Sequence, residues 1–416
     1  MPTDSLKVAV VSDLHFVNRT KINDGSHHSW LTFNEDKTFT NNFWQSLIQK
    51  IQRESIVADI LVCPGDITTH SEKSALVYAW EKINELAIAL NCKTLIASTG
   101  NHDVNSRGFK VDNPIRSLNA DHCLVENLKQ LTPIYPLVNI GKGETTDDHL
   151  NRIHYFGSNF LHKETDTYNL ITLNSCSNHT NDPAAYEKGF ISKSTHQWLE
   201  KTLKASKSKN KKLGILVCHH HPIQHSEHNL GNYDFMNGGT ELLEMLNKYG
   251  RWIVVHGHKH HSKISYYSDG SKKTVVFAAG TLSCHKESLG NEFTNQFYVM
   301  NINSGKQRGT PEGVLDVYSW QGNSWSLSKR KSDGVFTGVG FGDVGCLDEL
   351  AENIANKITP VTGKPWTEIL EDFPKIKNCV PKDLTHLQEI LEEYNIDFVF
   401  NDNDEIIKLE KTEVQL

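Results

Sequence analysis

The sequence lacks the features of a membrane protein and of a disulfide-stabilised secreted protein. No stretch of its 416 residues approaches the roughly 20 apolar residues that a membrane-spanning helix needs. The eight cysteines form no C-x-x-C pair, and several lie in apolar runs such as ILVCPGD, where a free thiol packs as a small hydrophobic group. The first apolar run, which starts at Val8, is too short for a signal peptide. We therefore expect a cytoplasmic protein with reduced thiols and no membrane contact.

Basic residues are scarce at the C-terminal end. From Asp333 to Leu416 there is no arginine, and 18 acidic residues stand against 7 lysines, which gives a net charge of −11. The whole chain carries −7, so the first 332 residues carry +4. Because an acidic segment repels the nucleic-acid backbone, nucleic acid is a partner that the sequence permits but does not favour.

Two hydrophobic patterns alternate through the first half of the chain. Short runs rich in β-branched residues predict buried strands, and stretches such as 39–54 and 71–90 between them predict helices. The strand-like runs are KVAVVS, ADILVCPGD, KTLIAST, NLITLNSC, KLGILVCHH and RWIVVHG. This alternation predicts an α/β layer architecture. After His261 the pattern changes to hairpin-like strands, which we expect to end near residue 328.

A second, smaller domain is predicted at the C-terminus. Residues 328–345 are rich in Gly, Ser and Lys and have the composition of a linker. Beyond them, two helical stretches and a hairpin pattern predict a small α+β module. We therefore expect domains at 1–330 and 331–416, with the second as an accessory module through which a homo-oligomer can form. A chain that ends near Ser332 is expected to fold and to keep its activity.

Potential metal ligands follow the strand-like runs. They are Asp13 and His15 in SDLH, Asp66 in PGD, Asn101, His102 and Asp103 in GNHD, the histidines of CHHHP, and His258 and His260 in GHKH. The carboxyl ends of strands in an open α/β sheet meet at one edge, so we expect these side chains to converge. Carboxylates with neutral imidazoles suit divalent Mn, Fe or Zn better than Ca or Mg. Asp13, His15, Asp66, Asn101, His258, His260 and one histidine of CHHHP make seven ligands, too many for one tetrahedral ion, and they fit two ions with a shared ligand.

The ordered set D-x-H, G-D, G-N-H-D, H-x-P and G-H-x-H resembles the calcineurin-like metallophosphoesterase superfamily over residues 6 to 320. Within it, SDLH, PGDIT, GNHDV, the His-His-Pro turn and AAGTL are most similar to the class III cyclic-nucleotide phosphodiesterase branch. The resemblance implies a four-layer β-sandwich, in which two mixed sheets are flanked by helices. It does not cover the module after residue 333.

The resemblance also implies a ligand assignment. One ion would be bound by Asp13, His15 and His260, and the other by Asn101, His220 and His258, with Asp66 as the bridge. The family's H-x-P motif selects His220, two residues before Pro222. His219 and His221 stay open as alternatives within the triplet.

Two further residues have implied catalytic roles. Water or hydroxide held between the ions would be the nucleophile. Since neighbouring side chains diverge, His102 is not expected to share an ion with Asn101. It is the candidate for protonating the leaving oxygen or binding a phosphate oxygen, with Asp103 orienting its ring.

The expected activity is hydrolysis of a phosphodiester bond in a cyclic nucleotide or related small nucleotide. The alternatives are a DNA or RNA nuclease, a phosphomonoesterase or phosphoprotein phosphatase, and a binding scaffold without turnover. The acidic C-terminal module, which has no basic or aromatic stripe, counts against a nuclease. The complete ligand set counts against a scaffold.

Overall fold

The structure is a computed structural model that carries side chains. It describes residues 5–21, 29–34, 43–106, 125–180, 182–206, 212–224, 235–269, 272–284, 294–306, 308–329, 332, 334–358, 363–402 and 405–412.

The first of two large β-sheets combines a parallel centre with an antiparallel flank. Its strand order is β15-β14-β13-β1-β4-β5-β6, with β16 paired to β14. The strands are β1 (Ser5–Val10), β4 (Ile60–Cys63), β5 (Thr94–Ala97), β6 (Leu137–Asn139), β13 (Gln296–Asn303), β14 (Gly313–Trp320), β15 (Trp325–Leu327) and β16 (Gly340–Phe341). The strands β1, β4 and β5 run parallel, so their carboxyl ends lie at one edge.

The second sheet has the same mixed character. Its order is β11-β12-β10-β9-β8-β7. The strands are β7 (Phe160–Glu164), β8 (Tyr168–Leu173), β9 (Leu213–Val217), β10 (Arg251–His256), β11 (Lys263–Asp269) and β12 (Lys272–Ala278). Here β8, β9, β10 and β12 are parallel, and β7 and β11 pair antiparallel at the two sides. A separate two-stranded pair joins β2 (Val17–Asn18) and β3 (Thr32–Phe33).

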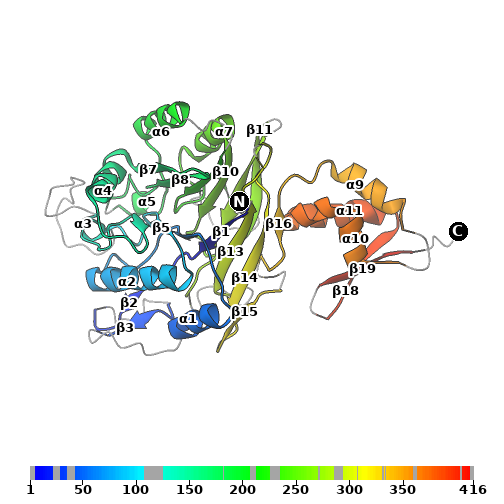
Figure 1. Cartoon of the computed structure of the whole chain (residues 1–416), viewed down its shortest axis with the longest axis horizontal. Coiled ribbons are helices and arrows are strands. Elements are labelled where there is room, and N and C mark those ends of the chain that lie inside the picture. Colours follow the sequence, from blue (N-terminus) through cyan, green and yellow to red (C-terminus); the bar gives the residue numbers. More distant parts are fainter. Residues whose placement is uncertain are drawn as a thin grey trace.

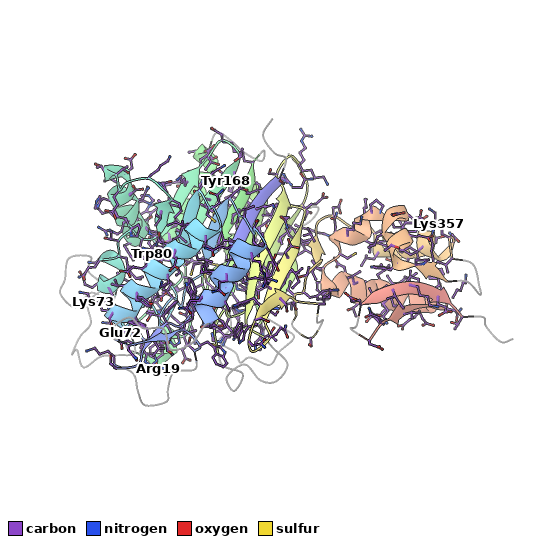
Figure 2. All side chains as sticks on the ribbon, turned by 60° about the horizontal axis from the view of Figure 1, so that its bottom comes forward. Arg19, Glu72, Lys73, Trp80, Tyr168 and Lys357 are labelled. Atoms are coloured by element: carbon purple, nitrogen blue, oxygen red, sulfur yellow. The ribbon has the colours of Figure 1, made fainter. Side chains whose placement is uncertain are left out.

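Helices cover the outer faces of both sheets (Figure 1). They are α1 (Phe43–Arg53), α2 (Lys73–Ala89), α3 (Glu126–Lys129), α4 (Thr146–Ser158), α5 (Pro183–Tyr186), α6 (Lys193–Ala205) and α7 (Gly239–Tyr249). The helices α1 and α2 lie on the side of the first sheet, and α6 and α7 on the side of the second. Figure 2 shows α2 with Trp80, whose indole N–H donates to the Pro133 carbonyl.

Two hydrophobic cores separate these layers. The larger core contains side chains from both sheets, such as Val10 and Val62 of the first and Val217 and Val255 of the second. The smaller core packs the other face of the second sheet against apolar residues of α6 and α7, including Leu199. The predicted four-layer α/β sandwich, two mixed sheets flanked by helices, is therefore confirmed.

The C-terminal module has its own core and its own small sheet. It contains α9 (Leu347–Ala355), β17 (Lys364–Pro365), α10 (Trp366–Asp372), the 3₁₀ helix η2 (Pro374–Asn378), α11 (Pro381–Glu393), β18 (Ile396–Phe400) and β19 (Ile406–Lys411). The strand order of the sheet is β17-β19-β18. The β18–β19 hairpin packs beside α10 and α11, which is the arrangement of a winged helix. Figure 1 shows this module at one end of the molecule. The predicted small α+β module is present.

The segment expected to be a linker packs on the catalytic sandwich. The predicted boundary at 330/331 falls on residues outside the described ones. Beyond it, Val335, Val339 and Phe341 are buried in the larger core, and β16 pairs with β14. The glycines between these apolar residues therefore serve the turns of a packed segment. We propose that the catalytic unit ends after Phe341 and not at residue 330.

Candidate metal centre

The predicted ligands lie just beyond the carboxyl ends of five parallel strands. Asp13, Asp66 and Asn101 follow β1, β4 and β5 of the first sheet, whereas His219 and His258 follow β9 and β10 of the second. Backbone hydrogen bonds join the loops within each sheet, since His15 N–H donates to the Asp66 carbonyl at 3.0 Å and Gly257 N–H to the His219 carbonyl at 3.1 Å. Between the sheets, His258 N–H donates to the Asp13 carboxylate at 3.1 Å. The two sheets thus contribute to one site.

Four ligand atoms converge at one position of this site. The Oδ1 atom of Asn101 lies 2.9 Å from His219 Nε2 and 3.2 Å from His258 Nδ1. The two imidazole nitrogens are 3.2 Å apart, and His219 Nε2 lies 3.3 Å from Asp66 Oδ2. Ligands at about 2.0–2.2 Å from a tetrahedral ion lie roughly 3.3–3.5 Å from one another. The spacing and the N/O donor set therefore fit a divalent transition metal.

A second set converges beside it. His15 Nε2 and His260 Nε2 are 3.1 Å apart, and His260 Nε2 lies 3.4 Å from Asp13 Oδ1. The distance from His15 Nε2 to Asp66 Oδ2 is 3.7 Å. The same Asp66 oxygen therefore faces both sets, as a bridging ligand must.

The charges of Asp66 and His258 agree with metal binding. Burial by itself raises the pKa of Asp66, but the neighbouring His219, His102 and His15 outweigh it and hold this pKa well below its usual value. Burial, together with His220 and His219, holds the pKa of His258 well below its usual value. An ionised carboxylate and a neutral imidazole are the forms that bind a metal ion.

His219, rather than His220, makes the short contacts to the set that contains Asn101, although His220 also offers a ring nitrogen within 4.8 Å of those of His219 and His258. His219 Nε2 makes the short contacts to Asn101, Asp66 and His258, and its Nδ1 lies 3.1 Å from the Pro64 carbonyl, which orients the ring. The ring of His220 instead has its Nδ1 2.9 Å from Ser175 Oγ. We therefore propose His219 as the ligand in place of His220, which the H-x-P spacing favoured.

Alanine substitutions in the triplet distinguish these two assignments. With Mn²⁺ as the metal, His219→Ala should lose about one of the two ions and lower turnover by more than about 100-fold, since even residues that support metal ligands reach 10–100-fold. His220→Ala should keep both Mn²⁺ ions and most of the activity. Metal analysis and a diesterase assay on both variants measure this, and the reverse pattern would restore His220 as the ligand.

The backbone at the ligands is strained. Asp13, His15, Asp66, His258 and His260 all have positive φ, between 48° and 85°, which side chains with a Cβ rarely adopt. Each such residue costs about 1–3 kcal/mol and persists because the surrounding fold enforces it. This strain lies where the ligands are, as is typical of a preorganised functional site.

Two glycines allow the ligand loops to approach one another. A Cβ on Gly100 would overlap the backbone and carboxylate of Asp66, and one on Gly257 would overlap Ser12 and the Asp13 carboxylate. Only glycine permits this separation of the loops. The glycines of GNHD and GHKH are thus part of the site's geometry.

The side chains of His102 and Asp103 have different partners. The His102 ring packs edge-on against His15, with centroids 4.8 Å apart, while its backbone N–H donates to Asp66 Oδ1 at 2.7 Å. Both carboxylate oxygens of Asp103 accept backbone N–H groups, from Ile67, Thr68 and Gly100. Burial, followed by the charge of Asp66, raises the pKa of Asp103 to about 7. We therefore propose that Asp103 positions the two loops, in place of its predicted role in orienting the His102 ring.

The sequence did not predict the residues that hold the ligands in place through hydrogen bonds. Cys284 Sγ lies 3.2 Å from His260 Nδ1, and Thr281 Oγ1 donates to the Asp13 carbonyl at 2.6 Å. Thr281 belongs to the AAGTL motif and Cys284 follows it, so this motif was the one feature of the sequence that pointed to these supporting residues. The contacts themselves join residues far apart in the chain, and no spacing rule predicts them.

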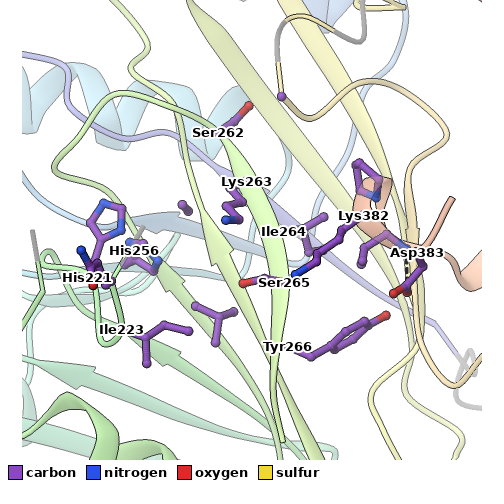
Figure 3. A pocket seen from close by; sticks show the side chains of 16 residues that line it. His221, Ile223, His256, Ser262, Lys263, Ile264, Ser265, Tyr266, Lys382 and Asp383 are labelled. Atoms are coloured by element: carbon purple, nitrogen blue, oxygen red, sulfur yellow. Dashed lines mark hydrogen bonds between the residues drawn. The ribbon is translucent and has the colours of Figure 1, made fainter. Parts of the chain in front are cut away.

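A cavity of about 400 Å³ lies beside the centre, between the sandwich and the winged helix. Figure 3 shows His221 and His256 at one end of it and Lys382 and Asp383, from the start of α11, at the other. The His221 and His256 rings are 4.2 Å apart, and the His221 ring is 6.4 Å from that of His258. The C-terminal module therefore borders a cavity that reaches the loops carrying two proposed ligands.

A four-layer α/β sandwich that gathers two Asp/Asn/His ligand sets around one shared carboxylate has the architecture of a dinuclear metallohydrolase. Residues 6–262, more than half of the chain, match the family model described as Calcineurin-like phosphoesterase. The chain belongs to this family of metal-dependent phosphoesterases, whose members use two divalent metal ions, and its clustered His and Asp side chains offer ligands for them. The cyclic-nucleotide branch stays a prediction. A second model, described as wHTH-Calcineurin_assc, matches residues 339–393, which include most of the winged helix.

Other comparisons add no argument about function. No curated protein sequence matches the chain. Similar solved structures include a purple acid phosphatase from yellow lupin (Lupinus luteus) seeds, with 11% identity, coverage of 77% of this chain and 52% of that one, and a TM-score of 0.44. The NAD nucleotidase of Haemophilus influenzae has 12% identity, coverage of 79% and 54%, and a TM-score of 0.35. Vps29 of Chaetomium thermophilum has 11% identity, coverage of 77% of this chain and 95% of that one, and a TM-score of 0.28. The chain thus spans about half the length of the phosphatase and the nucleotidase. Among the helices that the structure describes, none is both long and apolar enough to cross a membrane.

Proposed function

We propose that this phosphoesterase hydrolyses a phosphodiester bond in a small nucleotide, such as a cyclic nucleotide. The single observation that carries the hydrolytic part is the position of Asp66 Oδ2, which faces both ligand sets. Asp13, His15 and His260 would hold one ion, and Asn101, His219 and His258 the other. When bound, two such ions acidify water and neutralise charge on the phosphate oxygens.

The protein's own groups have separate tasks in this proposal. His102, next to the ligands but partly exposed, faces the substrate side and supplies a proton to the leaving oxygen. Asp103 holds the loops of Asp66 and Asn101 at a fixed separation through three backbone N–H groups. Preorganised donors of this kind need no rearrangement during the reaction.

Two features support a small diester over a nucleic acid. The motif set is most similar to phosphodiesterases that act on cyclic nucleotides. The winged helix, which borders the cavity beside the centre, is strongly acidic, and Glu389, Glu392 and Glu393 are exposed on or at the end of α11. An acidic module that borders this cavity repels polyanions more than a singly charged small diester. The cytoplasmic location and a homo-oligomer through this module stay predictions.

A substrate screen tests the proposal. The full chain reconstituted with Mn²⁺ should hydrolyse bis-p-nitrophenyl phosphate and at least one cyclic nucleotide faster than p-nitrophenyl phosphate or single-stranded DNA. A preference for the monoester would identify a phosphomonoesterase or phosphoprotein phosphatase instead. A preference for single-stranded DNA would identify a nuclease.

Removing the His102 imidazole should affect catalysis and not metal binding. The bond from its backbone N–H to Asp66 persists in His102→Ala, so both ions should be retained while turnover falls by about 10²–10⁴-fold. The loss should be larger for a poor leaving group than for p-nitrophenolate, because only the poor one needs the proton. Kinetics with both leaving groups and metal analysis measure these effects.

His70→Ala is the matched control, since the His70 ring stacks on that of His102 with centroids 5.5 Å apart. It should reduce turnover far less and without dependence on the leaving group. Loss of metal from His102→Ala would place this side chain among the ligands, and an equal loss for both leaving groups would contradict its role as an acid.

A further inference from the structure

Another group of potential metal ligands lies next to the proposed centre. Cys176, His179 and His220 each offer one sulfur or nitrogen atom, and these atoms lie within 4.8 Å of one another. All three side chains are buried, with exposed fractions of 4%, 0% and 1%. Cys176 and His179 follow β8, and His220 follows β9, its parallel neighbour. The three residues therefore converge for the same topological reason as the predicted ligands.

The hydrogen bonds of the two imidazoles indicate which ring nitrogen carries the proton. His179 Nε2 lies 3.1 Å from the Lys188 carbonyl, which only accepts, so Nε2 carries the proton and Nδ1 has a lone pair. When Nδ1–H of His220 donates to Ser175 Oγ, 2.9 Å away, its Nε2 likewise has a lone pair. Metal-binding histidines usually have their other ring nitrogen held in this way.

The Nε2 atom of His220 points to an additional ligand. It is buried and has no hydrogen-bond partner among the residues that the structure describes. Buried polar atoms normally have a partner, so such an atom indicates a bound group at this position. With His219 assigned to the Asn101 set, His220 is available for a different ion.

We propose that Cys176, His179 and His220 bind a third metal ion, distinct from the two ions of the catalytic centre. A set of one thiolate and two imidazoles is soft and nitrogen-rich, which suits Zn²⁺ and does not suit Mn²⁺ or Mg²⁺. Cys176 Sγ–H donates to the Thr99 carbonyl at 3.1 Å, and this thiol would have to lose its proton to bind the ion as a thiolate.

The position of this ion indicates what it does. It links the loop after β8 to the loop after β9, which also carries His219, and Cys176 additionally contacts the carbonyl of Thr99, two residues before Asn101. A metal crosslink here fixes two loops that hold proposed ligands of the catalytic centre. The third ion is therefore structural, and no reaction step depends on it.

Metal content and cobalt absorption test this proposal. The full chain, stripped with a chelator and desalted after reconstitution, should retain about three equivalents of Zn²⁺ but two of Mn²⁺. Its Co²⁺ form should show a near-ultraviolet sulfur-to-cobalt charge-transfer band, which the Asp, Asn and His ligands of the catalytic centre cannot give. Cys176→Ser should abolish the band and lose about one equivalent of Zn²⁺.

Cys284→Ser is the matched control, because Cys284 also lies beside a proposed ligand, His260. It should keep the band and all three equivalents. A wild-type chain with two equivalents of Zn²⁺ and no band would overturn the proposal, as would a band that disappears in Cys284→Ser and persists in Cys176→Ser. The wild-type measurements decide the question even if Cys176→Ser does not fold, and His179→Gln gives a second variant. Since none of these readouts is activity, the outcome is independent of the proposed substrate.

Discussion

Replacing Asp66 by asparagine should remove metal and activity together. The Oδ2 atom of Asp66 faces both ligand sets, and an uncharged amide bridges two cations poorly. We expect Asp66→Asn to lose at least one ion and to lower turnover by about 10³-fold or more, since metal ions supply several kcal/mol of transition-state stabilisation and each 1.36 kcal/mol is about tenfold in rate. Metal analysis and a diesterase assay measure both effects.

Asp148→Asn is the control for a buried carboxylate without a metal. Asp148 is also buried, but it caps α4 through Thr145. This variant should lose some stability, about 0.5–2 kcal/mol, and keep both ions. If Asp66→Asn retained two ions and full activity, Asp66 would not be the bridge, and the dinuclear assignment would have to be withdrawn.

Ending the chain at Ser332 should destabilise the catalytic sandwich, contrary to the expectation from the linker-like composition. This truncation removes Val335, Val339 and Phe341 from the larger core, and each buried apolar side chain contributes about 1.5–3 kcal/mol. The combined loss of about 5–9 kcal/mol is comparable with the roughly 5–15 kcal/mol by which typical domains are stable. We expect this chain to aggregate or to bind little metal.

A chain that ends at Gly345 provides the matched comparison. It keeps the three core residues and the pairing of β16 with β14, while it lacks the helices of the module. This chain should fold, bind two Mn²⁺ ions and hydrolyse bis-p-nitrophenyl phosphate at a rate comparable with that of the full chain. Thermal unfolding, metal analysis and the assay compare the two truncations. Equal stability would show that residues 334–341 are a linker after all.

The winged helix is the part of the molecule about which the sequence motifs said least. The helices α9 and α11 and the hairpin were predictable from hydrophobic periodicity, whereas α10 was not among the expected elements. All of these elements contribute to a separate core that contains Leu350, Ile369, Leu387 and Leu409. The way in which the module docks on the sandwich was not predictable. Tyr266 of β11 contacts the carbonyls of Gly342 and Asn378 through its hydroxyl group, and Gly342 lies 76 residues from Tyr266 in the chain. Such contacts depend on where the folded second sheet places its edge strand β11.

The sequence by itself determined the strands, the order of their terminal motifs and hence the family and the nature of the metal site. Each of these features is local, since a buried strand, the turn that ends it and its two or three polar residues are contiguous in the chain. Local patterns alone therefore indicate six of the proposed ligands, which are Asp13, His15, Asp66, Asn101, His258 and His260.

Only the tertiary structure bears on three points: which residue of the CHHHP triplet makes short contacts to Asn101, what Asp103 contacts, and our proposal that the catalytic unit ends after Phe341. All three histidines of the triplet have the same chemistry and adjacent positions, so their roles depend on the twist and register of β9 against β10. Residues 334–341 have a linker's composition, yet their few apolar side chains meet a core built by strands far away in the sequence. Asp103 lies next to His102 in the chain, but backbone N–H groups from two loops occupy its oxygens. In each case the deciding contact joins segments that the fold, and not the local sequence, brings together.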